Sequence, residues 1–212
     1  EIIRENMPDG LADELLPIIN DDIPEIIEYI LLSVSKIDSL LSGLLRISRL
    51  GRTSLNVEKI DMNRLIENVI GTFEFQIKQS KVNLTIDPLP NCIGDESQIN
   101  QVFSNLVSNA VKYCDPNKDA KIHISGYEDD DKAIYFVEDN GIGISPEHQE
   151  KIFDMFYRLD PNSTQGDGLG LNIVRKILDR HGGKVWVESE YGKGSKFFVL
   201  LPKIKNEILL DV

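Results

Sequence analysis

The stretch Asn105-Leu106-Val107-Ser108-Asn109-Ala110-Val111-Lys112-Tyr113 decides what kind of domain this chain forms. In a helix, Asn105 and Asn109 lie four residues apart and Lys112 follows three further on, so these side chains share one face. Asparagine is a weak helix former, which makes two of them in one helix unusual. Amide oxygens suit Mg²⁺, and an ammonium group suits phosphate. We therefore expect a metal- and phosphate-binding helix face, and a solvated helix face is the alternative.

A second segment, Val137 to Ile144, has the sequence VEDNGIGI and is typical of a strand that ends in a carboxylate and two glycines. Glycine allows the backbone to approach a flat ligand closely. The carboxylate of Asp139 could accept a hydrogen bond from an exocyclic amine such as that of adenine. Taken alone, Asp-Asn-Gly is more often a simple turn.

A third segment, Phe153 to Arg158, combines aromatic residues with an arginine, FDMFYR. Arg158 offers a planar fork that fits phosphate, whereas the aromatic residues taken singly indicate core packing.

The fourth segment, Gly166-Asp-Gly-Leu-Gly-Leu171, opens a predicted helix. Backbone N–H groups at a helix start, unhindered where glycine lacks a side chain, form an anion site. The spacing matches neither the dinucleotide-binding nor the P-loop pattern. The polar residues 160–165 before it are typical of a lid over a ligand.

The first fifty residues differ from the rest because aliphatic residues dominate them. Apolar residues recur there at alternating steps of four and three, which is a heptad seam: Ile23, Ile27, Ile30, Val34, Ile37, Leu41 and Leu44. Asp21 or Asp22 would cap this helix, and Gly51 would end it. Its length favours self-association in a bundle over an amphipathic helix lying on its own domain.

The remaining pattern predicts helices over 62–79, 96–111, 146–153 and 169–181, and strands over 82–86, 121–127, 133–138, 184–190 and 195–201. We therefore expect an α+β fold, a two-layer sandwich of a mixed sheet covered by helices, preceded by a long bundle-forming helix. The predicted division is a helical region over 1–54, a ligand-binding domain over 55–205 and a tail over 206–212.

Composition limits the classes of partner. The chain has 212 residues and a formal net charge of −12, which disfavours nucleic-acid binding. No apolar run reaches the ~20 residues of a membrane span, so membrane attachment is expected only through regions outside this chain. The cysteines, Cys92 and Cys114, are expected to be reduced thiols of a cytoplasmic domain.

Together the four segments carry a specific resemblance. Residues 94–202 resemble the catalytic ATP-binding domain of sensor histidine kinases of two-component systems, within the superfamily that includes gyrase, Hsp90 and MutL. The segments match its N box, first glycine box, F box and second glycine box in order. Residues 21–51 resemble the second helix of the family's dimerisation and phosphotransfer hairpin.

The resemblance implies ATP and Mg²⁺ as cofactors and assigns roles. Asn109 would bind Mg²⁺, with Asn105 as a second candidate ligand, and Lys112 and Arg158 would hold phosphates, so that Asn105, Asn109 and Lys112 form the catalytic set. Tyr113 would stack near adenine and Asp139 would accept from its amine, supported by Ser195 through water. The base pocket and lid would be formed by Gly141, Gly143, Ile144, Gly166, Gly168, Leu169, Gly170 and Leu171. Asp167 departs from the Thr or Ser that is common at its position.

The resemblance also implies a phosphate-accepting histidine, which this chain does not supply. His123, His148 and His181 lack the family's context for it, so we expect the acceptor upstream, outside this chain. The implied partners are a response-regulator receiver domain and a second copy of the chain, bound through the N-terminal helix. The alternatives are a non-kinase ATPase or ATP-gated switch, which would need a glutamate base at the position of Asn105, and a dimerising scaffold with an inactive site.

Overall fold

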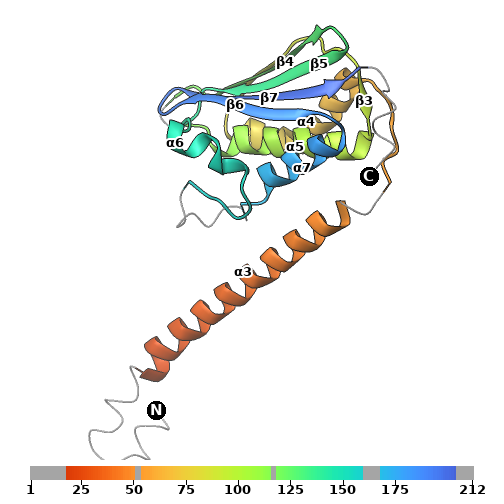
Figure 1. The fold of residues 1–212 in the computed structure, drawn as a ribbon. Helices are drawn as coiled ribbons and strands as arrows, with labels where there is room; N and C mark the ends of the chain where they lie inside the picture. Colours follow the sequence, from red (N-terminus) through yellow and green to blue (C-terminus); the bar gives the residue numbers. More distant parts are fainter. Residues whose placement is uncertain (1–17, 51–53, 116–117, 160–167, 204–212) are drawn as a thin grey trace, which may run out of the picture. The chain divides into compact units, whose positions relative to one another are not determined.

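A computed structural model describes residues 18–50, 54–115, 118–159 and 168–203. The chain divides into two compact units, Glu1–Arg46 and Ile47–Val212. The predicted α+β class is confirmed, because the second unit is a mixed sheet with helices packed against one face (Figure 1). The predicted tail over 206–212 and residues 1–17 of the predicted helical region lie outside the described residues.

The first unit contains most of the long helix that the heptad seam predicts. A short π-helix, η1 (Ile18–Asp22), leads directly into α3 (Ile23–Leu50), so the helix begins after the acidic pair that was expected to cap it. All seven seam side chains are exposed, from 43% for Ile23 to 57% for Val34 and Ile37. Within the described ranges, no helix has the length and hydropathy of a membrane span.

The second unit is built on five strands in the order β2-β4-β5-β7-β6. The strands β2 (Asn83–Ile86) and β4 (Lys121–Asp129) run parallel. The other neighbours are antiparallel, namely β4 with β5 (Lys132–Asp139), β5 with β7 (Gly194–Pro202), and β7 with β6 (Lys184–Glu190). The turn between β4 and β5 is shorter than predicted, because the pairing continues to Asp129 and Lys132.

Helices α4 (Met62–Gln79), α5 (Glu96–Lys112) and α7 (Gly170–Arg180) cover one face of this sheet (Figure 1). The core lies between the two layers, where alternate residues of β5 point toward α5. Phe103 of α5 meets Tyr135 of β5 edge to face, with ring centroids 5.7 Å apart. This packing holds the C-terminal end of β5 beside the α5 face that carries Asn105 and Asn109.

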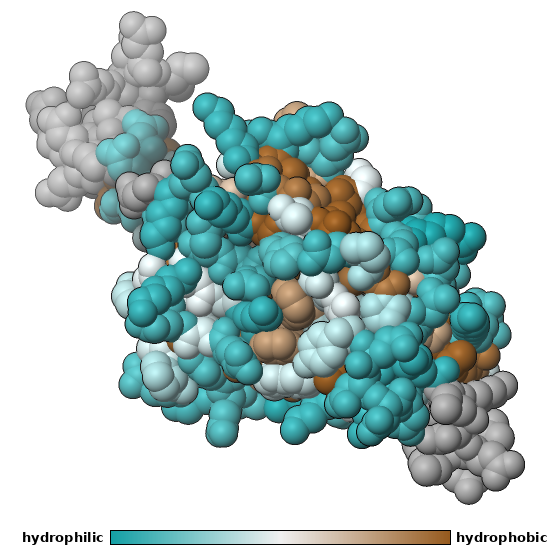
Figure 2. Space-filling model, turned by 90° about the horizontal axis from the view of Figure 1, so that it is seen from above, coloured by the Kyte–Doolittle hydropathy of each residue, from teal (hydrophilic) through white to brown (hydrophobic). Residues whose placement is uncertain are grey.

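The opposite face of the sheet also carries apolar residues, which come to the surface among hydrophilic ones (Figure 2). Trp186 stacks on Phe198 with centroids 4.9 Å apart, and Phe198 lies 6.0 Å from Phe136. The ammonium of Lys196 lies 3.7 Å from the centre of the Phe136 ring, so the aliphatic stem and charge of the lysine partly cover the aromatic row.

Two three-residue strands escaped prediction because they are too short to show alternation. They are β1 (Glu58–Ile60) and β3 (Cys92–Gly94), which pair antiparallel. Each leads directly into an aspartate that caps a helix: Asp61 caps α4 and Asp95 caps α5. The small ribbon therefore aligns the starts of both helices.

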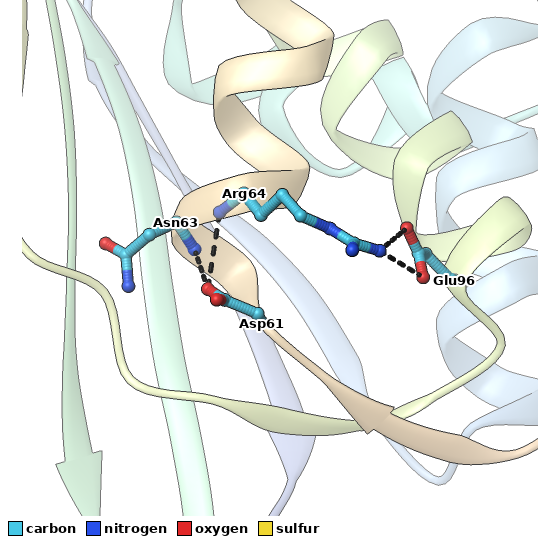
Figure 3. Close-up of polar contacts among 4 residues, drawn as sticks. All are labelled: Asp61, Asn63, Arg64 and Glu96. Atoms are coloured by element: carbon cyan, nitrogen blue, oxygen red, sulfur yellow. Dashed lines mark hydrogen bonds and ion pairs between the residues drawn. The ribbon is translucent and has the colours of Figure 1, made fainter.

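Asp61 accepts hydrogen bonds from the backbone N–H groups of Asn63 and Arg64, and Arg64 reaches across to Glu96 at 3.2 Å (Figure 3). This ion pair is exposed and contributes little to stability, so the aspartate caps contribute more than the ion pair to fixing the starts of α4 and α5.

The predicted helix over 146–153 is broken. It consists of α6 (Pro146–Gln149) followed by one 3₁₀ turn, η2 (Lys151–Phe153). The tighter turn brings Ile152 and Phe153 into the core, where they are 7% and 6% exposed. Burial of these side chains therefore overrides continuation of the helix.

His181 connects the ends of two helices. It ends α7, as its position before two glycines predicts, and its side chain is 1% exposed. Nδ1 lies 2.7 Å from the carbonyl oxygen of Ile177 and therefore carries the proton, while Nε2 accepts from the backbone N–H of Asp95 at 3.0 Å. The ring is thus held neutral, and burial lowers its pKa.

Replacing His181 by Ala should destabilise the fold by about 1–3 kcal/mol, because the buried N–H of Asp95 loses its acceptor. The pKa of His181 is lowered in the folded state, so the unfolded chain binds the proton more readily. Wild-type stability should therefore fall as the pH drops below about 6.5. Urea unfolding between pH 8 and pH 5 should show a smaller pH slope in His181→Ala, and identical slopes would contradict this role.

Candidate functional site

A cavity of about 640 Å³ opens at the ends of β5 and β7, with walls from α4, α5 and the start of α7. It brings together most of the residues that the sequence indicated: Asn105, Asn109, Lys112, Tyr113, Asp139, Gly143, Ile144, Arg158, Gly168, Gly170, Leu171 and Ser195. Gly141 and Leu169 do not line it, and Gly166 lies outside the described residues. Its size is that of ordinary small-ligand sites.

The α5 wall presents one polar face, as its spacing predicts. The Nδ2 group of Asn105 donates to the carbonyl of Gln101 at 2.9 Å, which turns Oδ1 toward the start of α7. A Cβ on Gly170 would lie 3.0 Å from that oxygen. The ammonium of Lys112 lies 4.7 Å from the centre of the Tyr113 ring. Amide oxygen, ammonium and aromatic ring thus follow one another along the wall.

Asp139 ends β5 with its side chain only 9% exposed. Its Oδ1 accepts from the backbone N–H of Gly141 at 2.9 Å. Burial raises the pKa of Asp139 to about 6, while hydrogen bonds from the Gly141 and Ser195 backbones act in the opposite direction. At neutral pH the Asp139 carboxyl is therefore mostly ionised and acts as a buried hydrogen-bond acceptor.

The glycines after Asp139 serve backbone packing. A Cβ on Gly141 would lie 2.2 Å from the carbonyl oxygen of Tyr113, and one on Gly143, where φ is +69°, would lie 2.1 Å from the carbonyl oxygen of Glu190. Gly141 therefore acts behind the cavity, where its N–H holds Asp139, and Gly143 also reaches the cavity wall.

Arg158 is a further cation in the cavity lining. Its Nη2 atom is buried and has no hydrogen-bond partner among the residues that the structure describes. The backbone before it is fixed: Phe156 has φ of +63°, and its N–H donates to the carbonyl of Gly168 at 3.0 Å. Arg158 is half-buried as a residue, and a buried Nη2 donor without a partner indicates an anionic ligand.

Leu169, next to Gly168, is 1% exposed and belongs to the hydrophobic core. It anchors the start of α7, so its side chain supports the cavity from within the core. Ser195 is also buried, and its hydroxyl lies 2.9 Å from that of Ser189.

Several lining residues were missed by sequence reasoning. Helix α4 contributes Phe73, Gln76 and Gln79, and its C-cap residue Ser80 also lines the cavity. Other elements add Ser108, Val111, Ile142, Ile152, Tyr157, Leu159 and Phe197. Polar residues on an amphipathic helix normally face solvent, so the pattern of α4 gave no signal of a ligand.

The histidines have partners within the domain. His123 of β4 lies 2.7 Å from the Asp87 carboxylate, and His148 of α6 lies 2.6 Å from the Tyr157 hydroxyl. His181 is buried between α5 and α7. Placement of His123 on a strand agrees with its predicted structural role.

Comparison with known proteins identifies the family to which this chain belongs. Residues 94–205 match the model of the histidine kinase-, DNA gyrase B-, and HSP90-like ATPases. The chain is 41% identical over 175 residues to cyanobacterial phytochrome B of a Nostoc species, covering 80% of this chain and 23% of the relative. It is 32% identical over 206 residues to sensor protein SrrB of Staphylococcus aureus, covering 94% of this chain and 34% of SrrB. The chain thus spans about a third or less of these relatives.

Solved structures of histidine kinases share the fold of this chain. The catalytic domain of histidine kinase ThkA is 34% identical and superposes with a TM-score of 0.62, covering 70% of this chain and 96% of that domain. Full-length ShkA in complex with AMPPNP is 28% identical with a TM-score of 0.67, covering 77% of this chain and 35% of ShkA. The ordered segments, the fold and the matched model lead to one conclusion: the chain belongs to the family of histidine kinase-, DNA gyrase B- and HSP90-like ATPases.

Proposed function

We propose that this chain is the ATP-binding catalytic part of a sensor histidine kinase, which transfers the γ-phosphate of ATP to a histidine outside the described residues. The phosphate would then pass to an aspartate of a response regulator. The observation that carries the proposal is the polarity of the cavity wall. Among its described residues, amides and cations line it together, and Asp139 is the sole carboxylate.

Three features of the lining residues support binding of a nucleotide with Mg²⁺ in this cavity. The unused Nη2 donor of Arg158 would be satisfied by a phosphate oxygen. The missing side chain at Gly170 leaves room beside the Asn105 oxygen. Asn109, with Asn105 as the second candidate, would supply hard oxygen ligands for Mg²⁺.

In this proposal the residues act by positioning and by charge. Asp139 accepts a hydrogen bond from the adenine amine, beside Tyr113 and the backbone of Gly143. Lys112 and Arg158 hold phosphate oxygens, and the backbone at Gly168 and Gly170 approaches them closely. Bound Mg²⁺ would supply neutralisation of charge on the phosphates. Catalysis then rests on a fixed geometry of donors around the transferred group.

The residues of the cavity wall also disfavour the ATPase alternative. Activation of water needs a general base near the γ-phosphate. Asn105 cannot remove a proton, and in this proposal the carboxylate of Asp139 binds the adenine amine and not the attacking water. The described wall thus favours transfer to an acceptor that arrives from outside the cavity.

We further propose that a receiver domain and a second copy of the chain are the protein partners. A solved complex of the histidine kinase ThkA with response regulator TrrA, 26% identical with a TM-score of 0.66, supports the first. The exposed apolar seam of α3 supports the second, because an apolar helix stripe gains stability when a partner covers it.

Replacing Asn109 by Ala should weaken Mg²⁺-dependent ATP binding by about tenfold or more, because a metal ligand is lost. Alanine favours helix, so α5 should persist. The matched control is Asn100→Ala on the same helix, which lies outside the cavity lining. Calorimetric titration with and without Mg²⁺ measures the effect, and equal affinities in both variants would refute the assignment.

ATP affinity should fall as the pH is lowered from 7 to 5. Burial raises the pKa of Asp139 to about 6, so protonation removes the acceptor within this range. The expected loss is about tenfold at pH 5. Asp139→Asn is the control, because the phosphates of ATP titrate equally with both proteins. The assignment fails if wild type and Asp139→Asn show the same pH dependence.

The kinase activity itself is tested with a parent chain that includes residues before Glu1. Incubation with radiolabelled ATP should give an acid-labile, alkali-stable phosphohistidine on those residues, and Asn109→Ala should abolish it. Steady release of phosphate without phosphohistidine would instead favour the ATPase alternative.

A further inference from the structure

His148 forms a hydrogen bond with Tyr157 that has no role in the proposed function as described so far. Its Nδ1 lies 2.6 Å from the hydroxyl of Tyr157, and the Tyr157 ring lines the cavity. Nε2 of His148 lies 3.5 Å from the carboxylate of Glu147, which favours a proton on Nε2. Nδ1 is then the acceptor and the tyrosine hydroxyl the donor.

The histidine stands on a helix that is bound to the sheet. In α6, the next residue, Gln149, donates through Nε2 to the Ser189 carbonyl at 2.7 Å and to the Ile144 carbonyl at 3.1 Å. The hydroxyl of Ser189 accepts from the N–H of Ile144 at 2.8 Å. His148 is therefore fixed relative to β6 and to the glycine segment that follows Asp139.

Tyr157 is in turn the neighbour of Arg158, whose Nη2 is buried without a partner in the described part of the chain. The other end of this segment is held by α7, since the carbonyl of Phe153 accepts from Asn172 and from Arg175, each at 2.9 Å. The hydrogen bond between His148 and Tyr157 holds the same segment at its other end, next to Arg158.

We propose that His148 is a positioning residue: by holding the Tyr157 hydroxyl, it sets where Arg158 stands relative to Asp139, and so tunes affinity for the phosphates of the nucleotide. The inference rests on the proposed function, because it needs a phosphate-bearing ligand in this cavity. The inference predicts a selective effect, because Asp139, the acceptor proposed for the adenine amine, is held by the N–H of Gly141 and not by the His148–Tyr157 bond.

The test compares Mg²⁺-ATP with adenosine as ligands of the full chain. His148→Phe keeps a flat ring but removes the acceptor, and it should weaken ATP binding about fivefold while adenosine affinity changes less than about twofold. His148→Asn should restore ATP affinity, because its Oδ1 can take the place of Nδ1. Tyr127→Phe, an exposed tyrosine on β4, is the control for loss of a hydroxyl.

Tyr157→Phe removes the same bond from the other side and should match His148→Phe, and the double variant should be no weaker than either single one. Unchanged ATP affinity in His148→Phe and Tyr157→Phe would overturn the inference. So would equal losses for ATP and adenosine, which indicate a general collapse of the site. If wild type binds neither ligand, the proposed function itself fails, which distinguishes the two failures.

Discussion

The close approach of backbone segments around Asp139 is the constraint on which the site depends. Gly194, with φ of +121°, lies so near that a Cβ there would be 2.0 Å from the Asp139 carbonyl oxygen, and a Cβ on Gly141 would be 2.2 Å from the carbonyl oxygen of Tyr113. These contacts bring the ends of β5, β7 and α5 together. They also bury the Asp139 carboxylate, whose raised pKa is the electrostatic cost of that burial. A side chain at either glycine would separate these segments and widen the cavity around Asp139.

The cavity that this constraint shapes combines two kinds of chemical group. Asp139, beside Tyr113, offers an acceptor and an aromatic surface, whereas Lys112 and Arg158 offer positive charge. The whole chain has a net charge of −12, so these two cations act as local groups within an acidic surface. A ligand that joins an amine-bearing ring to an anionic group matches both kinds of group, and ATP is such a ligand.

Prediction from sequence worked where a pattern reports directly on burial or on backbone freedom. The heptad seam gave α3 and the 3.6-residue period gave α4, which the structure places over 62–79 as predicted. The polar face of α5 was found because Asn105 and Asn109 are poor helix formers. The pattern failed for β1 and β3, which are too short to alternate, and for the α4 lining residues, whose polarity resembles that of a solvated face. The packing role of Gly141 depends on Tyr113, a contact that residue spacing does not reveal.

The most direct test of the account is a structure of the full chain crystallised with Mg²⁺ and a non-hydrolysable ATP analogue. The account predicts the adenine amine within hydrogen-bond distance of the Asp139 carboxylate, Mg²⁺ on the Asn109 amide oxygen, and a phosphate oxygen on the Nη2 atom of Arg158. A nucleotide bound elsewhere, or bound in this cavity with its phosphates directed away from Asn109 and Arg158, would contradict it.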